Sequence, residues 1–167
     1  FSILAHYAQT GTPAWDWEMA CLLTALPQPA RVKLDGSMLE QGRAESPRAF
    51  LIRVIDQLKG ASTELIEQTL QWLRGQVGGA AQRIAAEERC LSWMQLRQMA
   101  RSGMEIGSHG LTHRSLVRLP HAEAIAEIRD SKPLIESQVG APCAHFAFPF
   151  GSLRDYNQTL ITEVQQA

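Results

Sequence analysis

Two histidines lie four residues apart in the segment Ser108-His109-Gly110-Leu111-Thr112-His113. Imidazole nitrogens are common zinc ligands, and two of them can converge on one ion if the intervening backbone makes a single turn. The spacing alone is weak evidence, because five histidines in 167 residues will sometimes form such a pair by chance. The alternative is a pair of partly buried histidines that cap the end of a strand.

The residues before this pair favour the metal site. Met104-Glu105-Ile106-Gly107 is predicted to form a short strand that ends directly before Ser108. In parallel α/β architectures, ligands gather outside the carboxyl ends of the strands. His109 and His113 are therefore our candidate metal ligands.

A second segment with possible chemistry is His145-Phe146-Ala147-Phe148-Pro149-Phe150-Gly151, at the end of an apolar strand predicted from Cys143 to Phe150. Pro149 would fix the approach of the backbone, so that the Phe150 N–H points toward a site at a set angle. Such a donor can stabilise an oxyanion without a polar side chain. The alternative is a buried aromatic strand that ends in a turn.

The elements around both segments alternate between helix and strand. Ser92-Trp93-Met94-Gln95 is a capping box that starts a helix, and Gly103 ends it. A long helical pattern runs from about Pro120 to Gly140, and Pro133 should kink it or divide it in two. A last helix is expected from about Asp155, which is a plausible N-cap. This alternation predicts an α/β fold with parallel strands and helical crossovers.

The first half of the chain is expected to be mostly helical, with a flexible segment at Gly78-Gly79-Ala80-Ala81 before the second half. The four tryptophans of the chain have helical surroundings and are expected to pack in the core rather than to stack on sugars. The expected elements are a helix over Trp15–Leu23, a hairpin or extended loop around Asp35-Gly36, a helix from Ser46-Pro47 to Gly60, and a helix from Ser62 to Gly75.

Composition excludes several classes of protein. Sixteen basic and seventeen acidic residues give a net charge of -1, which disfavours a nucleic-acid partner. No apolar run approaches the roughly 20 residues of a membrane span. The three cysteines, Cys21, Cys90 and Cys143, show no CxxC spacing and are expected to be buried thiols.

Taken together and in this order, the two segments resemble the polysaccharide deacetylase family, the NodB-homology domain of carbohydrate esterase family 4. Ser108 to His113 corresponds to the family's metal motif in the form S-H-G-L-T-H, and Phe146 to Gly151 matches F-x-x-P-[YF]-G. The resemblance extends from about Leu91 to Ala167. It implies a distorted (β/α) TIM-like barrel, with residues 1–90 as an opening strand and helical insertion of the same domain and residues 91–167 as its core.

The resemblance implies a metal-dependent hydrolase that removes N-acetyl groups from a polysaccharide or an N-acetylated amino sugar. His109 and His113 would bind zinc or another divalent transition metal. The Phe150 backbone N–H would hold the oxyanion, and Pro149 and Phe150 would contact the glycan. A bacterial protein is implied, with the cell envelope favoured over the cytoplasm. The alternatives are a non-catalytic glycan- or metal-binding module of the same fold and, from the first ninety residues, a helical interaction protein.

Two motifs of the family have no counterpart in the 167 residues. The early T-F-D-D-G motif, which supplies the base and a third ligand, is absent, and so is the late histidine motif. Ala147 stands where many members have an arginine. We therefore expect these residues to be part of a longer protein, rather than a degenerate homologue, and we expect them to release no acetate on their own.

Overall fold

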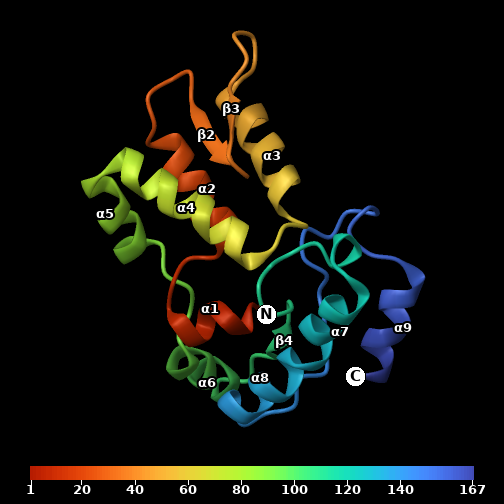
Figure 1. Ribbon diagram of the computed structural model, residues 1–167. Helices are drawn as coiled ribbons and strands as arrows, with labels where there is room; N and C mark the ends of the chain where they lie inside the picture. The colour runs from red at the N-terminus through yellow and green to blue at the C-terminus, as the bar shows by residue number, and fades with distance from the viewer. The chain divides into compact units, whose positions relative to one another are not determined.

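The chain divides near residues 14 and 90. In the computed structural model, which describes residues 1–167, residues 1–14 and 90–167 form one compact unit and residues 15–89 form another. We call them the motif unit and the helical unit. Both are mainly helical with a few short strands, so the chain has a mixed α/β fold (Figure 1). Each unit is described by itself.

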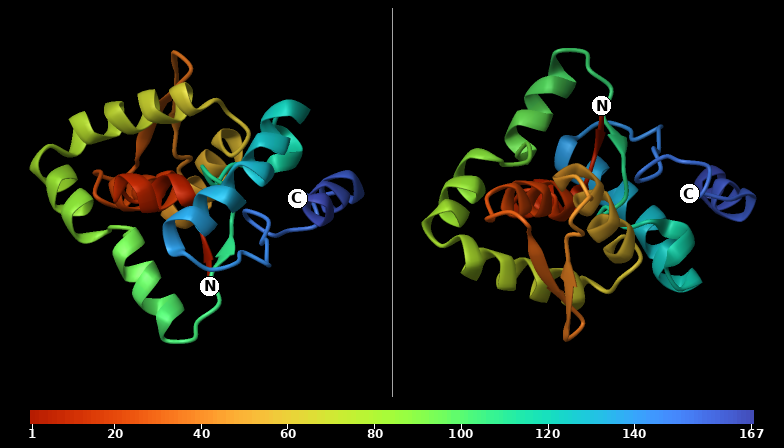
Figure 2. Two further views of the ribbon diagram at one scale, coloured as in Figure 1. Left: turned by 90° about the horizontal axis from the view of Figure 1, so that it is seen from below. Right: turned by 90° about the horizontal axis from the view of Figure 1, so that it is seen from above.

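Three segments of the motif unit run parallel to one another. Strand β1 (Ser2–Ile3) pairs with β4 (Gly107–Ser108), and the two arrows lie side by side in both views of Figure 2. On the other side of β4, Ser108 forms a parallel bridge with Phe146. The predicted parallel arrangement of the two motif segments is therefore confirmed, while the TIM-like barrel stays a prediction.

Both predicted strands of the motif unit are shorter than expected. The strand expected at Met104–Gly107 is displaced to Gly107–Ser108, and the apolar segment from Cys143 to Phe150 makes only the bridge at Phe146. The side chains of Met104 and Glu105 are exposed, and the parallel pairing with β1 begins only at Gly107.

The helices of the motif unit largely follow the sequence signals. The capping box at Ser92 is formed, and the long helical pattern is divided at Asp130, with Pro133 in the first turn of the second part. The first helix, α1, was not predicted. The helices are α1 (Ala5–Thr10), α6 (Trp93–Arg101), a 3₁₀ turn (Leu116–Arg118), α7 (His121–Arg129), α8 (Ser131–Val139) and α9 (Gln158–Gln166).

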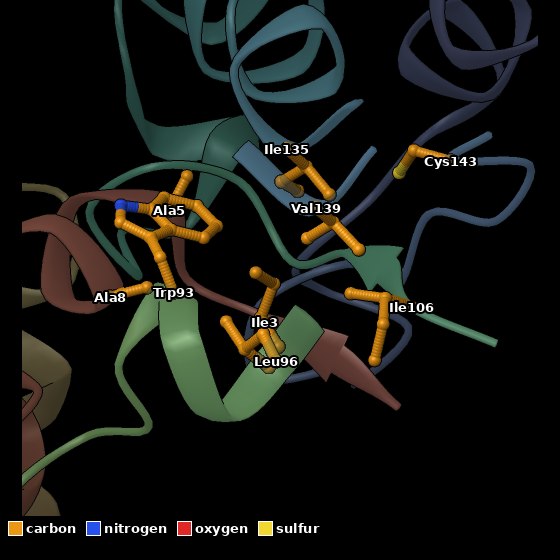
Figure 3. Close-up of a cluster of buried hydrophobic side chains, with 9 residues drawn as sticks. All are labelled: Ile3, Ala5, Ala8, Trp93, Leu96, Ile106, Ile135, Val139 and Cys143. Carbon is orange, nitrogen blue, oxygen red and sulfur yellow. The ribbon is translucent and has the colours of Figure 1, made fainter. Parts of the chain in front are cut away.

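Nine buried residues from β1, α1, α6, α8 and the segments beside β4 form an apolar core in the motif unit (Figure 3). Trp93 lies at one side of this core, and its indole N–H donates to the side chain of Gln9 at 2.9 Å. The core therefore holds the short strands in place between helices. Its members are Ile3, Ala5, Ala8, Trp93, Leu96, Ile106, Ile135, Val139 and Cys143.

The helical unit contains the predicted hairpin. Strands β2 (Arg31–Leu34) and β3 (Ser37–Glu40) are antiparallel and are joined by Asp35 and Gly36, whose φ angles are 45° and 77°. Two positive φ angles in a two-residue loop define the turn whose twist suits a hairpin. The helices of this unit are α2 (Trp15–Thr24), α3 (Pro47–Leu58), α4 (Thr63–Val77) and α5 (Gly79–Glu87).

Two predictions for the helical unit are wrong. Helix α4 continues through Gly75 to Val77, and α5 occupies the segment from Gly79 that we expected to be flexible. One glycine costs a helix only about 1 kcal/mol, so the flanking residues decide. The expectation for the tryptophans is half right: Trp15 and Trp93 are buried, whereas Trp17 is exposed and Trp72 half-buried.

The close approach of β4 to the segment at His145 generates the first prediction. A Cβ on Gly107 would lie 2.9 Å from the His145 carbonyl oxygen, and a backbone atom cannot easily move away. Gly107→Ala should therefore lower the free energy of unfolding by about 1–3 kcal/mol. Gly75→Ala, the same change in an open helical position, should raise it by about 0.5–1 kcal/mol. Urea unfolding followed by circular dichroism measures both, and an unaffected Gly107→Ala variant would contradict the strand packing.

Candidate metal-binding site

His109 is positioned by the two segments that flank β4. Its backbone N–H donates to the carbonyl of Ile3 at 2.8 Å, and its ring Nδ1 lies 2.8 Å from the carbonyl oxygen of Ala147. A carbonyl can only accept, so Nδ1 carries the proton of this hydrogen bond. In the neutral ring, Nε2 then has the lone pair, which is the form in which a histidine binds a metal ion.

His113 lies beside His109 and against the second motif. The centroids of the two imidazole rings are 4.9 Å apart, and the His113 ring stacks on the Phe150 ring at 4.8 Å with an interplanar angle of 25°. The structure thus brings together His109, His113 and Phe150, which were all singled out from the sequence. The rings are close enough for a nitrogen of each to bind one ion.

The backbone at His113 and Phe150 adopts an uncommon conformation. Their φ angles are 59° and 64°, and Asp35 in the hairpin turn is the one other non-glycine residue with a positive φ. For an L-residue this region costs on the order of 1–3 kcal/mol, and such positions cluster at functional sites. Two of the three positions in this chain are stacked on each other at the candidate site.

Gly110 makes room for the turn between the two histidines. Its φ is 80°, and a Cβ there would lie 3.0 Å from Oε2 of Glu127 and 4.0 Å from Cγ of Pro149. Pro149 itself is buried. A side chain at position 110 would therefore be strained by its own backbone and would displace the carboxylate.

Glu127 on α7 is a buried carboxylate that binds this turn. Its side chain accepts hydrogen bonds from the backbone N–H of Leu111 at 2.6 Å and of Thr112 at 3.0 Å, and from the Thr112 hydroxyl. Arg114, also buried, approaches the other oxygen at 3.5 Å and binds Glu123 at 2.9 Å. An anion with only 2% of its surface exposed is thereby hydrogen-bonded and paired with a cation.

A second buried carboxylate, Asp155, connects the two motif loops. Asp155 accepts from the Ser115 hydroxyl at 2.9 Å and from the Ser152 hydroxyl. Ser115 follows His113, and Ser152 follows the Pro-Phe-Gly segment, so one side chain joins both loops. The expectation that Asp155 caps the last helix is wrong, because Asn157 accepts the capping hydrogen bond from Leu160 at 2.9 Å.

The sequence reasoning missed Glu127, and it considered Asp155 only as an N-cap. Glu127 had a detectable signal, because it lies between Ala124 and Ile128, which are both on the buried face of α7. A carboxylate on the apolar face of a predicted helix indicates a specific buried partner. Asp155 had no comparable signal, since it lies outside any periodic segment.

His109 and His113 are suited to be two of the ligands of a metal ion. His109 has the tautomer of a ligand, and its hydrogen bond to a backbone carbonyl is the outer contact typical of metal-binding histidines. No group of three or more His, Cys, Asp or Glu side chains in residues 1–167 is arranged to hold a metal ion. The two histidines are the candidate donor set within this chain.

Comparison with known proteins identifies the family of this chain. Residues 54–167 match the family model described as polysaccharide deacetylase, which is more than half of the chain. The chain therefore belongs to the polysaccharide deacetylase family, a family of hydrolases. No curated protein and no solved structure matches it. None of its helices is long and apolar enough to cross a membrane.

The contacts of Asp155 generate the second prediction. Asp155→Ala removes the acceptor of two hydroxyls, one of them on the fully buried Ser115, and should lower the free energy of unfolding by about 1–3 kcal/mol. Asp130→Ala, at an exposed position of the same unit with no side-chain capping bond, should change it by less than about 0.5 kcal/mol. Equal effects of the two substitutions in urea unfolding would contradict the linking role of Asp155.

Proposed function

We propose that the protein is a metal-dependent hydrolase that removes N-acetyl groups from a polysaccharide or an N-acetylated amino sugar. The observation that carries the proposal is the meeting of His109, His113 and Phe150 at the carboxyl ends of parallel segments, in a member of the polysaccharide deacetylase family. The partner is an N-acetylated glycan.

His109 and His113 would hold zinc or another divalent transition metal. When bound, the metal supplies Lewis-acid chemistry, which polarises a carbonyl and lowers the pKa of a water molecule. The carbonyl of Ala147 keeps the His109 ring in the ligating tautomer. The Phe150 ring covers one side of the His113 ring and limits the rotation of that imidazole.

Phe150 would act on the substrate through its backbone. Its position beside His113 supports the assignment of its N–H as the donor to the oxyanion of the reacting acetamide. Pro149 is buried and lies near Gly110, so it would fix the backbone approach to the glycan. In this proposal the ring of Phe150 packs on His113, and its peptide N–H stabilises the oxyanion.

We further propose that the motif unit is part of a distorted (β/α) TIM-like barrel, in which the helical unit is an insertion. Residues 1–14 join residues 90–167 in one unit, although 75 residues, 15–89, separate them in the sequence. The parallel pairing of β1, β4 and the segment at Phe146 supports this arrangement, because parallel strands with helical crossovers are the elements of such a barrel.

Substitution of His109 tests the metal site. His109→Ala should lower the affinity of residues 1–167 for zinc by about tenfold or more, because one ligand of the two is lost. In the full-length protein it should abolish acetate release from an N-acetylglucosamine oligomer, and a chelator should do the same to the parent. His121→Ala, at an exposed position on α7, is the matched control and should leave both properties unchanged.

Zinc affinity is measured by titration and acetate release by an enzymatic assay. A full-length rate that survives the chelator or His109→Ala would contradict the proposed metal-dependent hydrolysis. Zinc binding through His109 without any acetate release from the full-length protein would instead support the non-catalytic glycan- or metal-binding module.

Phe150→Tyr tests the backbone role of Phe150. The half-buried ring can carry a hydroxyl, and the peptide N–H is unchanged, so the full-length protein should keep its turnover within several-fold of the parent. Pro149→Ala frees the backbone at a buried position and should cost more in kcat. Steady-state kinetics on the same oligomer compare the two variants. A larger loss for Phe150→Tyr than for Pro149→Ala would show that the ring, rather than the peptide group, is essential.

A further inference from the structure

We infer that Glu127 is a positioning residue for the proposed metal site, and that it sets the separation of His109 and His113 by fixing the backbone between them. The inference rests on the proposed function. It assigns to the buried carboxylate the fixing of the turn between the two histidines, through three hydrogen bonds that it accepts from Leu111 and Thr112.

The contacts of Glu127 fall on the turn between the histidines. One carboxylate oxygen, Oε2, accepts from the N–H groups of Leu111 and Thr112, which are two of the peptide groups that connect His109 to His113. The other oxygen, Oε1, accepts from the Thr112 hydroxyl. Three hydrogen bonds to two consecutive residues leave this turn little freedom, because buried donors without an acceptor are costly.

Helices α7 and α8 provide a rigid base for these contacts. Ala124 and Ile128, on either side of Glu127, are buried in an apolar cluster of the motif unit. Ser131, four residues after Glu127 at the start of α8, accepts a hydrogen bond of 2.7 Å from the Ser108 hydroxyl. The Ser108 hydroxyl oxygen in turn accepts from the N–H of Gly110 at 3.1 Å. The loop is therefore held at its start by Ser131 and in its middle by Glu127.

If Glu127 acts by positioning the turn, the length of its side chain matters, whereas if it acts by attracting the metal ion, its charge matters. Two conservative variants of Glu127 separate these roles. Glu127→Gln keeps the side-chain length and one oxygen that can accept both N–H groups, but it removes the negative charge. Glu127→Asp keeps the charge, but its side chain is one methylene shorter and falls short of the turn. Positioning predicts that the Gln variant is close to the parent and the Asp variant is impaired, whereas a purely electrostatic attraction of the cation predicts the reverse.

The experiment is a zinc titration of residues 1–167, in which the NMR signals of the imidazole rings report binding at His109 and His113. Glu127→Asp should weaken the zinc affinity measured at His109 and His113 by about tenfold or more, which is the usual effect of losing an outer contact of a metal site. Glu127→Gln should stay within about threefold of the parent. Glu123→Ala is the matched control, since this exposed carboxylate also binds Arg114 but contacts no peptide group between the histidines.

Each outcome decides a separate point. Circular dichroism shows first that the variants are folded, and the two conservative substitutions are chosen because both keep a polar group at position 127. Parent-like affinity of a folded Glu127→Asp variant, or weaker binding by Gln than by Asp, would overturn the positioning role. Zinc binding of the parent that His109→Ala leaves unchanged would overturn the proposed metal site itself, and with it this inference.

Discussion

The backbone pairing of Ser108 with both of its neighbours is the constraint on which the site depends. Its N–H donates to the carbonyl of His145 at 2.8 Å, its carbonyl accepts from Ala147 at 2.8 Å, and β1 pairs with β4 on the opposite side. These bonds fix the register of three segments that are far apart in the sequence. Because His109 follows directly, its ring comes to lie against the Ala147 carbonyl.

Two buried carboxylates fix the conformation of the loops that follow the paired segments. Strand pairing ends at Ser108, and apolar packing alone is not directional enough to fix a five-residue turn. Glu127 and Asp155 act through short, directed hydrogen bonds in a region shielded from water, where an unpaired polar group is expensive. Glu127 holds the turn between the histidines, and Asp155 joins the residues that follow each motif. His113, whose ring stacks on that of Phe150, directly follows Thr112, to which Glu127 is bound.

The sequence predicted the features that depend on local chemistry. The capping box at Ser92, the hairpin turn at Asp35-Gly36 and the break before Pro133 each follow from a few adjacent residues, and the structure has all three. The parallel pairing of the motif segments was also predictable, because a connection of more than thirty residues is long enough for a helical crossover.

Two features were not predicted from the sequence, one for a local reason and one because of a contact between distant residues. Helix α5 forms where glycines indicated flexibility, since the residues after Gly79 favour a helix more than the glycine opposes it. Asp155 has the residue type of an N-cap, but a buried hydroxyl 40 residues away binds it instead. Of the candidate site, the identity of His109, His113, Pro149 and Phe150 came from the motifs. The groups that hold them came only from the structure.

The most direct test of the account is a crystal structure of the protein loaded with zinc. The account predicts one zinc ion bound by a ring nitrogen of His109 and a ring nitrogen of His113, each at about 2.0–2.1 Å. The exposed pair of His145 and Glu105, with 3.1 Å between Nε2 and Oε2, serves as the internal comparison, since it offers metal-binding atoms away from both loops. Zinc bound at that pair, or by one of the two motif histidines alone, would contradict the central claim.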